Sequence, residues 1–173
     1  MRSQDLGGRI IKVDHAGEHG AINIYSGQIF IARWTAPALL DELLEFLTHE
    51  KRHREIFAEE LRRRGVRRCR SNVFCGIGGH LLGIITAIFG ASAIAATTLA
   101  VERVVLRHLR QQLAQLESND PHAVKAISAI IEDEQQHHDR SELLAKAGTF
   151  WPRVLMPVVS AATETVIWLG MRL

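Results

Sequence analysis

The chain carries two copies of one set of acidic and imidazole residues with the same internal spacing. In each copy a single Glu is followed 32 positions later by the Glu of a Glu-x-x-His motif, and the copies are offset by 84 residues. The two sets are Glu18, Glu50 and His53, and Glu102, Glu134 and His137. One Glu from each of two helices and one Glu-x-x-His from each of the other two form the ligand set of a di-metal site in a four-helix bundle. The repeat therefore predicts both an all-α fold and a metal pair.

The spacing also predicts where the chain reverses direction. If the two glutamates of each set lie at the same height on antiparallel helices, the turns must fall near residues 34 and 118, because each residue of a helix advances it by about 1.5 Å. The first turn coincides with residues 34–37, where Thr35 is a candidate N-cap and Pro37 suits a first helical turn. The second coincides with Ser-Asn-Asp-Pro at 118–121, a strong signal for ending one helix and starting another.

We expect one domain over residues 1–173, a ferritin-like four-helix bundle with a long crossover and an additional C-terminal apolar helix. The first helical hairpin is predicted over 8–64, the basic crossover over 65–79 and the second hairpin over 80–147. The individual helices are predicted at 9–33, 37–64, 80–117, 121–146 and 152–170. Gly65 and Gly148 are the expected stops of the second and fourth helices.

Charge is distributed unevenly along the chain. The formal net charge is only +2, which gives no support to a nucleic-acid partner, yet six arginines fall within residues 62–70. The following stretch, 73–101, contains no Asp, Glu, Lys or Arg. Four glycines early in that stretch and its direct continuation into Glu102 argue against a membrane-spanning helix. We expect a peripheral contact with an anionic membrane surface instead, with core packing or an oligomer interface as the alternative.

Localisation signals are few. Cys69 and Cys75 are too few for a disulfide framework or a zinc site, so we interpret them as free thiols in a reducing compartment. The N-terminus lacks the apolar core of a cleavable signal.

The ligand roles follow from the chemistry of iron pairs that activate O2. Such pairs need carboxylates to hold and bridge two ions and an imidazole on each ion. We expect Glu50 and Glu134 to bridge, and Glu18 and Glu102 to bind one iron each. The alternative for one Glu-x-x-His on a charged helix is a solvated surface. Two equally spaced copies, with the single glutamates among apolar residues, favour metal binding because a buried unpaired carboxylate is costly.

Several neighbouring residues are set aside because their helical rotation directs them away from the ligand face. They are His15, His19, His49, Glu132, Asp133 and His138. Asp133 could orient a ligand imidazole from outside the centre or lie exposed, and both alternatives stay open. His80 is interpreted as an interface residue.

At these positions the chain resembles the demethoxyubiquinone hydroxylases, the di-iron enzymes of late ubiquinone biosynthesis. Residues 13–28 read V-D-H-A-G-E-H-G-A-I-N-I-Y-S-G-Q, which is similar to the family's D-H-A-G-E-x-G-A…I-Y-x-G-Q. H-E-K-R-H at 49–53, A-V-E at 100–102 and D-E-Q-Q-H-H-D at 133–139 resemble its other motifs. The resemblance extends from about residue 9 to the end of the chain.

The resemblance implies hydroxylation of the ring of a polyprenylated methoxy-methyl-benzoquinone by two Fe ions, with O2 and electrons that ultimately come from NADH. It implies peripheral attachment at the cytoplasmic face of the inner (plasma) membrane and, in some organisms, a lipid-binding accessory partner; a homo-oligomer is the other partner we consider. Family members commonly have His-Tyr six and seven residues after the helix-three Glu. This sequence keeps His108 but has Leu109 in place of the Tyr. His108 is the candidate catalytic residue, for proton transfer or contact with the quinone, and a structural hydrogen bond is its alternative.

Three other functions compete with this one. One is a ferritin-like oxidoreductase that acts on another lipid or on a peroxide. A second is non-enzymatic iron binding or storage, which would require a polar outer surface that the uncharged 73–101 stretch contradicts. A third is a structural membrane bundle, which leaves the repeated ligand set without a reason.

Overall fold

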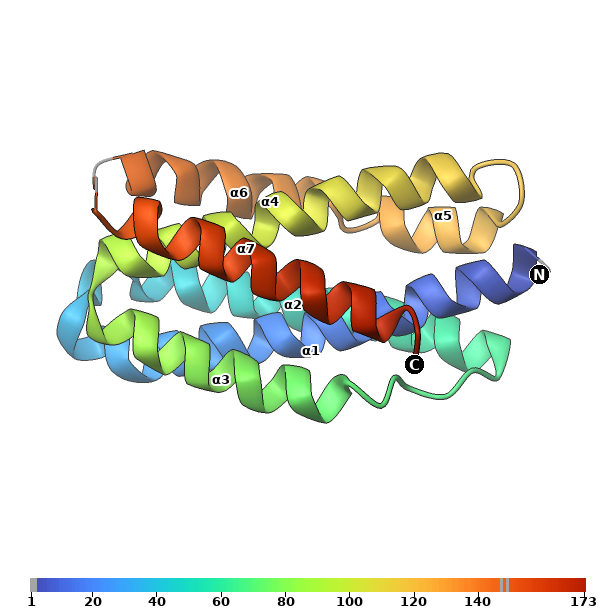
Figure 1. Cartoon of the computed structure of the whole chain (residues 1–173), viewed down its shortest axis with the longest axis horizontal. Coiled ribbons are helices and arrows are strands. Elements are labelled where there is room, and N and C mark those ends of the chain that lie inside the picture. Colours follow the sequence, from blue (N-terminus) through green and yellow to red (C-terminus); the bar gives the residue numbers. More distant parts are fainter. Residues whose placement is uncertain (1–2, 147, 149) are drawn as a thin grey trace.

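The computed structural model describes residues 3–146, 148 and 150–173, and this part of the chain forms helices and no strand (Figure 1). The helices are α1 (Ser3–Thr35), α2 (Leu40–Arg64), α3 (Asn72–Ile88), α4 (Ala91–Leu116), α5 (Pro121–Ser128), α6 (Ile131–Lys146) and α7 (Phe150–Gly170), with a short 3-10 turn η1 (Pro37–Leu39) before α2. The predicted all-α, ferritin-like architecture is confirmed.

The bundle consists of two helical hairpins, and two further helices lie against it. α1 and α2 form one antiparallel hairpin, and α4 with the consecutive helices α5 and α6 forms the other. α3 packs along α1, and α7 packs along α4 (Figure 1). The third bundle helix is thus α4, and the crossover that joins the hairpins includes the whole of α3.

The core contains a small apolar cluster around Leu99 and two larger ones along the bundle. One contains Ile11, Phe57 and Ile127, and the other contains Phe46 and Ile94, with their neighbours. Each large apolar side chain buried in this way contributes about 1.5–3 kcal/mol. Within each bundle helix, the residues of the repeated motif lie between the segment that contributes to one large cluster and the segment that contributes to the other. Apolar packing therefore stabilises the bundle on both sides of the motif residues.

Two of the predicted turn signals are confirmed and one is wrong. Gly65 ends α2 with φ of 64°, a left-handed conformation that glycine adopts without steric cost. Asp120 caps α5 by accepting a hydrogen bond from the backbone N–H of Ala123 at 3.1 Å. Thr35, the predicted N-cap of the second helix, is instead the last residue of α1. Its hydroxyl donates to the backbone oxygen of Ala87 at 2.7 Å and so ties α1 to the end of α3.

The predicted continuous helix over 80–117 is wrong. The chain breaks at Gly90, whose φ of 83° and ψ of −169° belong to a region that is essentially restricted to glycine. The break separates α3 from α4 and lets the chain turn from the outside of the bundle into it. Likewise, the predicted basic crossover 65–79 is irregular only up to residue 71, because α3 begins at Asn72.

The glycines of this region serve helix packing rather than disruption. A Cβ added at Gly79 would overlap with the backbone oxygen of Gly20, and one added at Gly83 would overlap with that of Ile24. α1 and α3 therefore approach so closely that only glycine fits at these contacts. The loss of about 1 kcal/mol of helix propensity at each glycine is offset by this packing.

The predicted helix 121–146 is interrupted as well. Ala129 and Ile130 form a turn between α5 and α6, without any Gly or Pro to cause it, and the buried Ile130 accepts a hydrogen bond from the N–H of Glu134 at 3.2 Å. Among the described residues, no helix combines the length and the apolar composition needed to cross a bilayer.

Candidate metal centre

The six residues of the repeat meet in the interior of the bundle, where none of them is more than 6% exposed. They form two groups in which one nitrogen or oxygen atom of every member lies within 4.8 Å of the others. The first group is Glu18, Glu50, His53 and Glu134, and the second is Glu50, Glu102, Glu134 and His137. Glu50 and Glu134 belong to both groups, as the expected bridging positions require.

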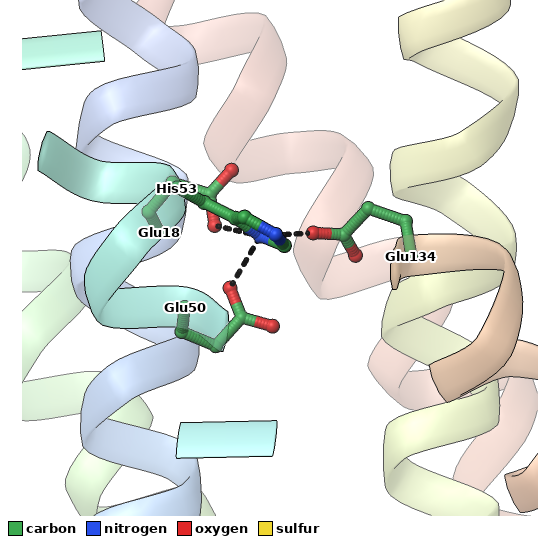
Figure 2. A group of neighbouring side chains, drawn as sticks. All are labelled: Glu18, Glu50, His53 and Glu134. Carbon is green, nitrogen blue, oxygen red and sulfur yellow. Dashed lines mark ion pairs between the residues drawn. The ribbon is translucent and has the colours of Figure 1, made fainter. Parts of the chain in front are cut away.

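In the first group three carboxylates surround one ring nitrogen of an imidazole (Figure 2). The Nδ1 atom of His53 lies 2.8 Å from an oxygen of Glu134, 3.7 Å from one of Glu50 and 3.9 Å from one of Glu18. These side chains come from three helices, α1, α2 and α6, and their polar atoms converge on one point.

The second group has the same arrangement around the imidazole of His137, the histidine of the second copy of the repeat. Nδ1 of His137 lies 3.2 Å from an oxygen of Glu50 and 3.9 Å from one of Glu134. Each imidazole therefore faces the Glu of its own Glu-x-x-His motif and that of the other. The i, i+3 spacing accounts for the first contact and the antiparallel pairing of the hairpins for the second.

Many of these polar atoms have no hydrogen-bond partner. Both carboxylate oxygens of Glu50, one oxygen of Glu134 and the Nδ1 atoms of both histidines are buried and make no hydrogen bond of good geometry, although Nδ1 of His53 and the Glu134 oxygen lie only 2.8 Å apart. A buried polar atom left in this state costs about 1–3 kcal/mol, and more if it is charged. Oxygen and imidazole donors that converge without hydrogen bonds are the donor set that iron and related divalent ions take. The residues therefore fit a pair of metal ions.

The outer nitrogen of each imidazole is held by a neighbour. Nε2 of His53 donates to a carboxylate oxygen of Asp133 at 2.8 Å, and Arg52 forms an ion pair with the same carboxylate. Nε2 of His137 lies 3.1 Å from Nδ1 of His49. Such partners fix the ring orientation, so that Nδ1 of each ring is directed at the carboxylates.

Burial and mutual repulsion shift the protonation of the carboxyl groups. Burial, and then the neighbouring Glu50, raise the pKa of Glu18 well above its usual value. Burial and Glu134 do the same to the pKa of Glu102. For His53, burial opposes the charge, but the adjacent carboxylates of Glu134 and Glu50 outweigh it and raise the pKa to about 10. Without a metal, protons neutralise part of the negative charge of the centre.

An apolar cavity of about 360 Å³ reaches the centre from one side. Residues of α1, α3, α4 and α7 make up most of its lining, which also includes Glu18, Glu50, Glu102 and Glu134. The apolar lining includes Ile24, Leu82, Val101, Val105, Val159 and Ile167. A small molecule with an apolar surface could therefore reach the polar atoms of the centre from between the two additional helices, α3 and α7.

His108 lines the same cavity, on α4. Its Nε2 lies 2.9 Å from a carboxylate oxygen of Glu164 on α7, and Arg107 forms an ion pair with the other oxygen. Burial, and then the nearby charge of Arg107, lower the pKa of His108, so the imidazole is neutral at pH 7. Leu109 beside it is buried in the core.

The family model described as "Ubiquinone biosynthesis protein COQ7" matches residues 5–170 of the chain. The chain belongs to this family. It is 33% identical over 168 residues to an NADPH-dependent 3-demethoxyubiquinone 3-hydroxylase, mitochondrial, of Dictyostelium discoideum, covering 95% of this chain and 76% of the relative. The human protein of the same name is 31% identical over 174 residues, with 95% and 77% covered. The 3-demethoxyubiquinol 3-hydroxylase of Rhodospirillum rubrum is 28% identical over 165 residues, with the same coverage.

The COQ7 membership agrees with the resemblance found in the motifs, and the structure brings together all six residues of the repeat. The neighbours that were set aside stay outside both groups of converging side chains. Asp133 and His49 nevertheless contact the two imidazoles from outside, which resolves the alternatives for Asp133 in favour of an orienting contact. Cys69 and Cys75 are unpaired, as predicted.

Sequence reasoning missed two residues of the site. Tyr25, the single tyrosine of the chain, donates its hydroxyl to a carboxylate oxygen of Glu102 at 3.0 Å. It lies seven residues after Glu18, two helical turns along the same face, so its position relative to the repeat was a usable signal. Glu164 carried no such signal, because only the packing of α7 on α4 brings it to His108.

Proposed function

We propose that this chain is a 3-demethoxyubiquinol 3-hydroxylase that adds a hydroxyl group to the ring of a polyprenylated methoxy-methyl-benzoquinone, using O2. The observation that carries the proposal is the pair of ligand groups that share Glu50 and Glu134 and open into an apolar cavity. The substrate is a polar ring on an apolar tail, and the lining of this cavity is mostly apolar but includes four of the six candidate ligands. We further propose that the electrons come from a reduced nicotinamide nucleotide, NADH in our expectation, although the names of the eukaryotic relatives specify NADPH.

The residues of the repeat would hold two Fe ions. Glu18 and His53 would bind one, Glu102 and His137 the other, with Glu50 and Glu134 bridging them. When bound, the iron pair supplies the open coordination positions and the electrons for the activation of O2. The unpartnered buried atoms support this assignment, because an ion would satisfy all of them at once.

The protein's own part in the reaction is to orient the ligands and exclude water. The carboxylate of Asp133 keeps a proton on Nε2 of His53, so Nδ1 is the nitrogen that would bind metal once its own proton has left. The apolar cavity walls keep bulk water from the centre, which limits the loss of reactive species to side reactions.

His108 is our candidate for proton transfer. It lines the cavity, is neutral at pH 7 and is oriented by Glu164, so its imidazole can accept a proton from a ring hydroxyl of the bound substrate. We expect His108→Asn to lower kcat more than it changes the iron content, because the residue lies outside both ligand groups.

We propose that the enzyme works at a membrane surface, peripherally, on the cytoplasmic face of the inner (plasma) membrane. α3 exposes a continuous apolar face that includes Val73, Phe74, Ile77, Leu81, Ile85 and Ile88. The arginine run of residues 62–70 directly precedes this helix. An exposed apolar face beside a basic segment is the pattern of an interfacial membrane contact. A second copy of the chain or a lipid-binding accessory protein is the partner we expect beside the membrane.

Loss of one bridging carboxylate tests the proposal most directly. Glu50→Ala should lose both iron and hydroxylation, whereas Glu59→Ala, an exposed carboxylate on the same helix, should keep both. Iron is measured on the purified proteins, and hydroxylation by the conversion of a demethoxy quinone. Retained hydroxylation in Glu50→Ala contradicts the metal assignment. Iron-loaded wild-type protein that leaves the quinone unchanged would contradict the substrate and favour another lipid or a peroxide.

A further inference from the structure

Gly78 differs from the other glycines of α3 in its surroundings. A Cβ added at Gly79 or Gly83 would overlap with the backbone of α1, and one added at Gly76 would come within 2.7 Å of the His19 imidazole. At Gly78 no heavy atom lies within 4 Å of an added Cβ. The close packing of α3 on α1 therefore explains three glycines and leaves the fourth without a structural reason.

A glycine at this position also weakens the helix. Gly78 is an exposed residue in the interior of α3, where glycine costs about 0.5–1 kcal/mol relative to Ala. What the missing side chain does provide is space at the cavity, because Gly78 is part of its lining. Any larger residue here would project into the open space at the cavity's edge.

The cavity is too small for the whole substrate of the proposed reaction. Its volume of about 360 Å³ lies at the lower end of the roughly 300–1,000 Å³ found for small-molecule sites. A ring with the first part of its tail fills such a volume, so a polyprenyl tail must leave the cavity. Two further lining residues mark where the cavity meets the surface: Phe74, one turn before Gly78 and 77% exposed, and Val166 on α7, 42% exposed.

We propose that Gly78 is a specificity-determining position whose missing side chain keeps open the passage between α3 and α7, through which the apolar tail of the substrate leaves toward the lipid. The proposal rests on the proposed function for the identity of the substrate. It adds that the length of tail the enzyme accepts depends on this one position in α3.

Substitution at Gly78 tests the passage without touching the metal centre. Gly78→Phe should fill the gap, Gly78→Leu should fill part of it, and Gly78→Ala should leave most of it open. Ala91→Phe is the matched control, because it enlarges an exposed side chain at the start of α4 that does not line the cavity. For each variant the iron content, the melting temperature and kcat/KM are measured with quinones that carry a single isoprenoid unit or a full-length tail.

We expect Gly78→Phe to lower kcat/KM for the long-tailed quinone about tenfold or more and to change that for the short-tailed one by less than about threefold, which is the scale on which filled pockets discriminate between substrates. Ala91→Phe should change neither value. Equal losses for both quinones, or no loss for either, overturn the proposal and leave the proposed function standing.

The two proposals can fail separately. If the wild-type enzyme hydroxylates neither quinone, the proposed function is wrong. Equilibrium binding of the two quinones to the wild-type and Gly78→Phe proteins then tests the passage by itself. Weaker binding of the long-tailed quinone alone supports the passage, and unchanged affinity for it overturns the passage.

Discussion

Metal loading should release protons from the centre, because the metal-free side chains carry protons that the ligands must lose. Glu18 and Glu102 have pKa values well above the usual range of a carboxyl group, first because they are buried and second because other carboxylates surround them. His53, held between carboxylates, has its pKa raised to about 10. In the absence of metal these shifts favour the protonated forms of Glu18 and Glu102, and His53 carries its proton at pH 7.

The number of protons follows from these three groups. A carboxylate binds metal as the anion, and an imidazole binds through a nitrogen that carries no proton. Because Nε2 of His53 donates its proton to Asp133, the proton that must leave is the one on Nδ1. Binding of the two ions should therefore release about one proton from His53, and the raised pKa values of Glu18 and Glu102 add to that release. The contribution of His53 should fade as the pH approaches 10.

Titration of the metal-free protein with Fe(II) in the absence of O2 measures this release. Calorimetry in two buffers of different protonation enthalpy gives both the number of ions bound and the number of protons released. Glu18→Gln should release fewer protons than the wild type, because an amide has no proton to lose in this range. Glu59→Gln, at the exposed position on α2, should release the same number as the wild type.

Two results would refute this reasoning. Uptake of two ions with no change in bound protons would mean that the carboxyl groups are already ionised, which contradicts the electrostatic account of the buried cluster. Binding of a single ion per chain would contradict the pair of groups that share Glu50 and Glu134.

Three further predictions test the surroundings of the centre. Asp133→Asn should weaken iron binding by about 10–100-fold, because the ring of His53 loses the carboxylate that orients it, and a competition titration with a chelator measures this. Gly83→Ala should destabilise the protein by about 1–3 kcal/mol, because the new Cβ overlaps with the backbone of α1. Gly78→Ala should stabilise it by up to about 1 kcal/mol, because it improves the helix propensity without an overlap. Urea unfolding measures both, and equal shifts would contradict the packing argument. Burial raises the pKa of Asp14 from 3.8 to about 7, so its ionisation lowers stability as the pH rises through that range. Asp14→Asn should therefore be more stable than the wild type by about 2–4 kcal/mol at pH 8 and nearly equal to it at pH 4, and a difference independent of pH would refute this.

The repeated ligand set could be predicted from the sequence because it is a local periodic pattern in each helix. An i, i+3 pair fixes a face, and an equal spacing of 32 residues fixes the height of two residues on antiparallel helices. The turn at Gly65 and the cap at Asp120 were equally local signals. Features of this kind depend on neighbouring residues alone, and all of these are present in the structure.

The division between α3 and α4 could not be predicted in the same way. Gly90 is one of five glycines between residues 76 and 90, and the sequence does not say which has a positive φ and which faces another helix. That depends on the packing against α1, a segment more than fifty residues away. The pair of His108 and Glu164 was hidden for the same reason, because it forms only after α7 has docked on α4.

The two helices that pack against the outside of the bundle, α3 and α7, determine what the bundle can take as a substrate. α1 and α4 present Glu18 and Glu102 on one side of the centre, and the cavity opens on that same side. α3 and α7 form the remaining walls of the cavity, so without them the centre would face an open groove. The glycines at the contact let α3 pack closely on α1, and the break at Gly90 directs the chain into α4. Together they position one of those walls. On the function we propose, the repeat supplies the metal chemistry, and the crossover and the C-terminal helix make that chemistry accessible to an apolar molecule.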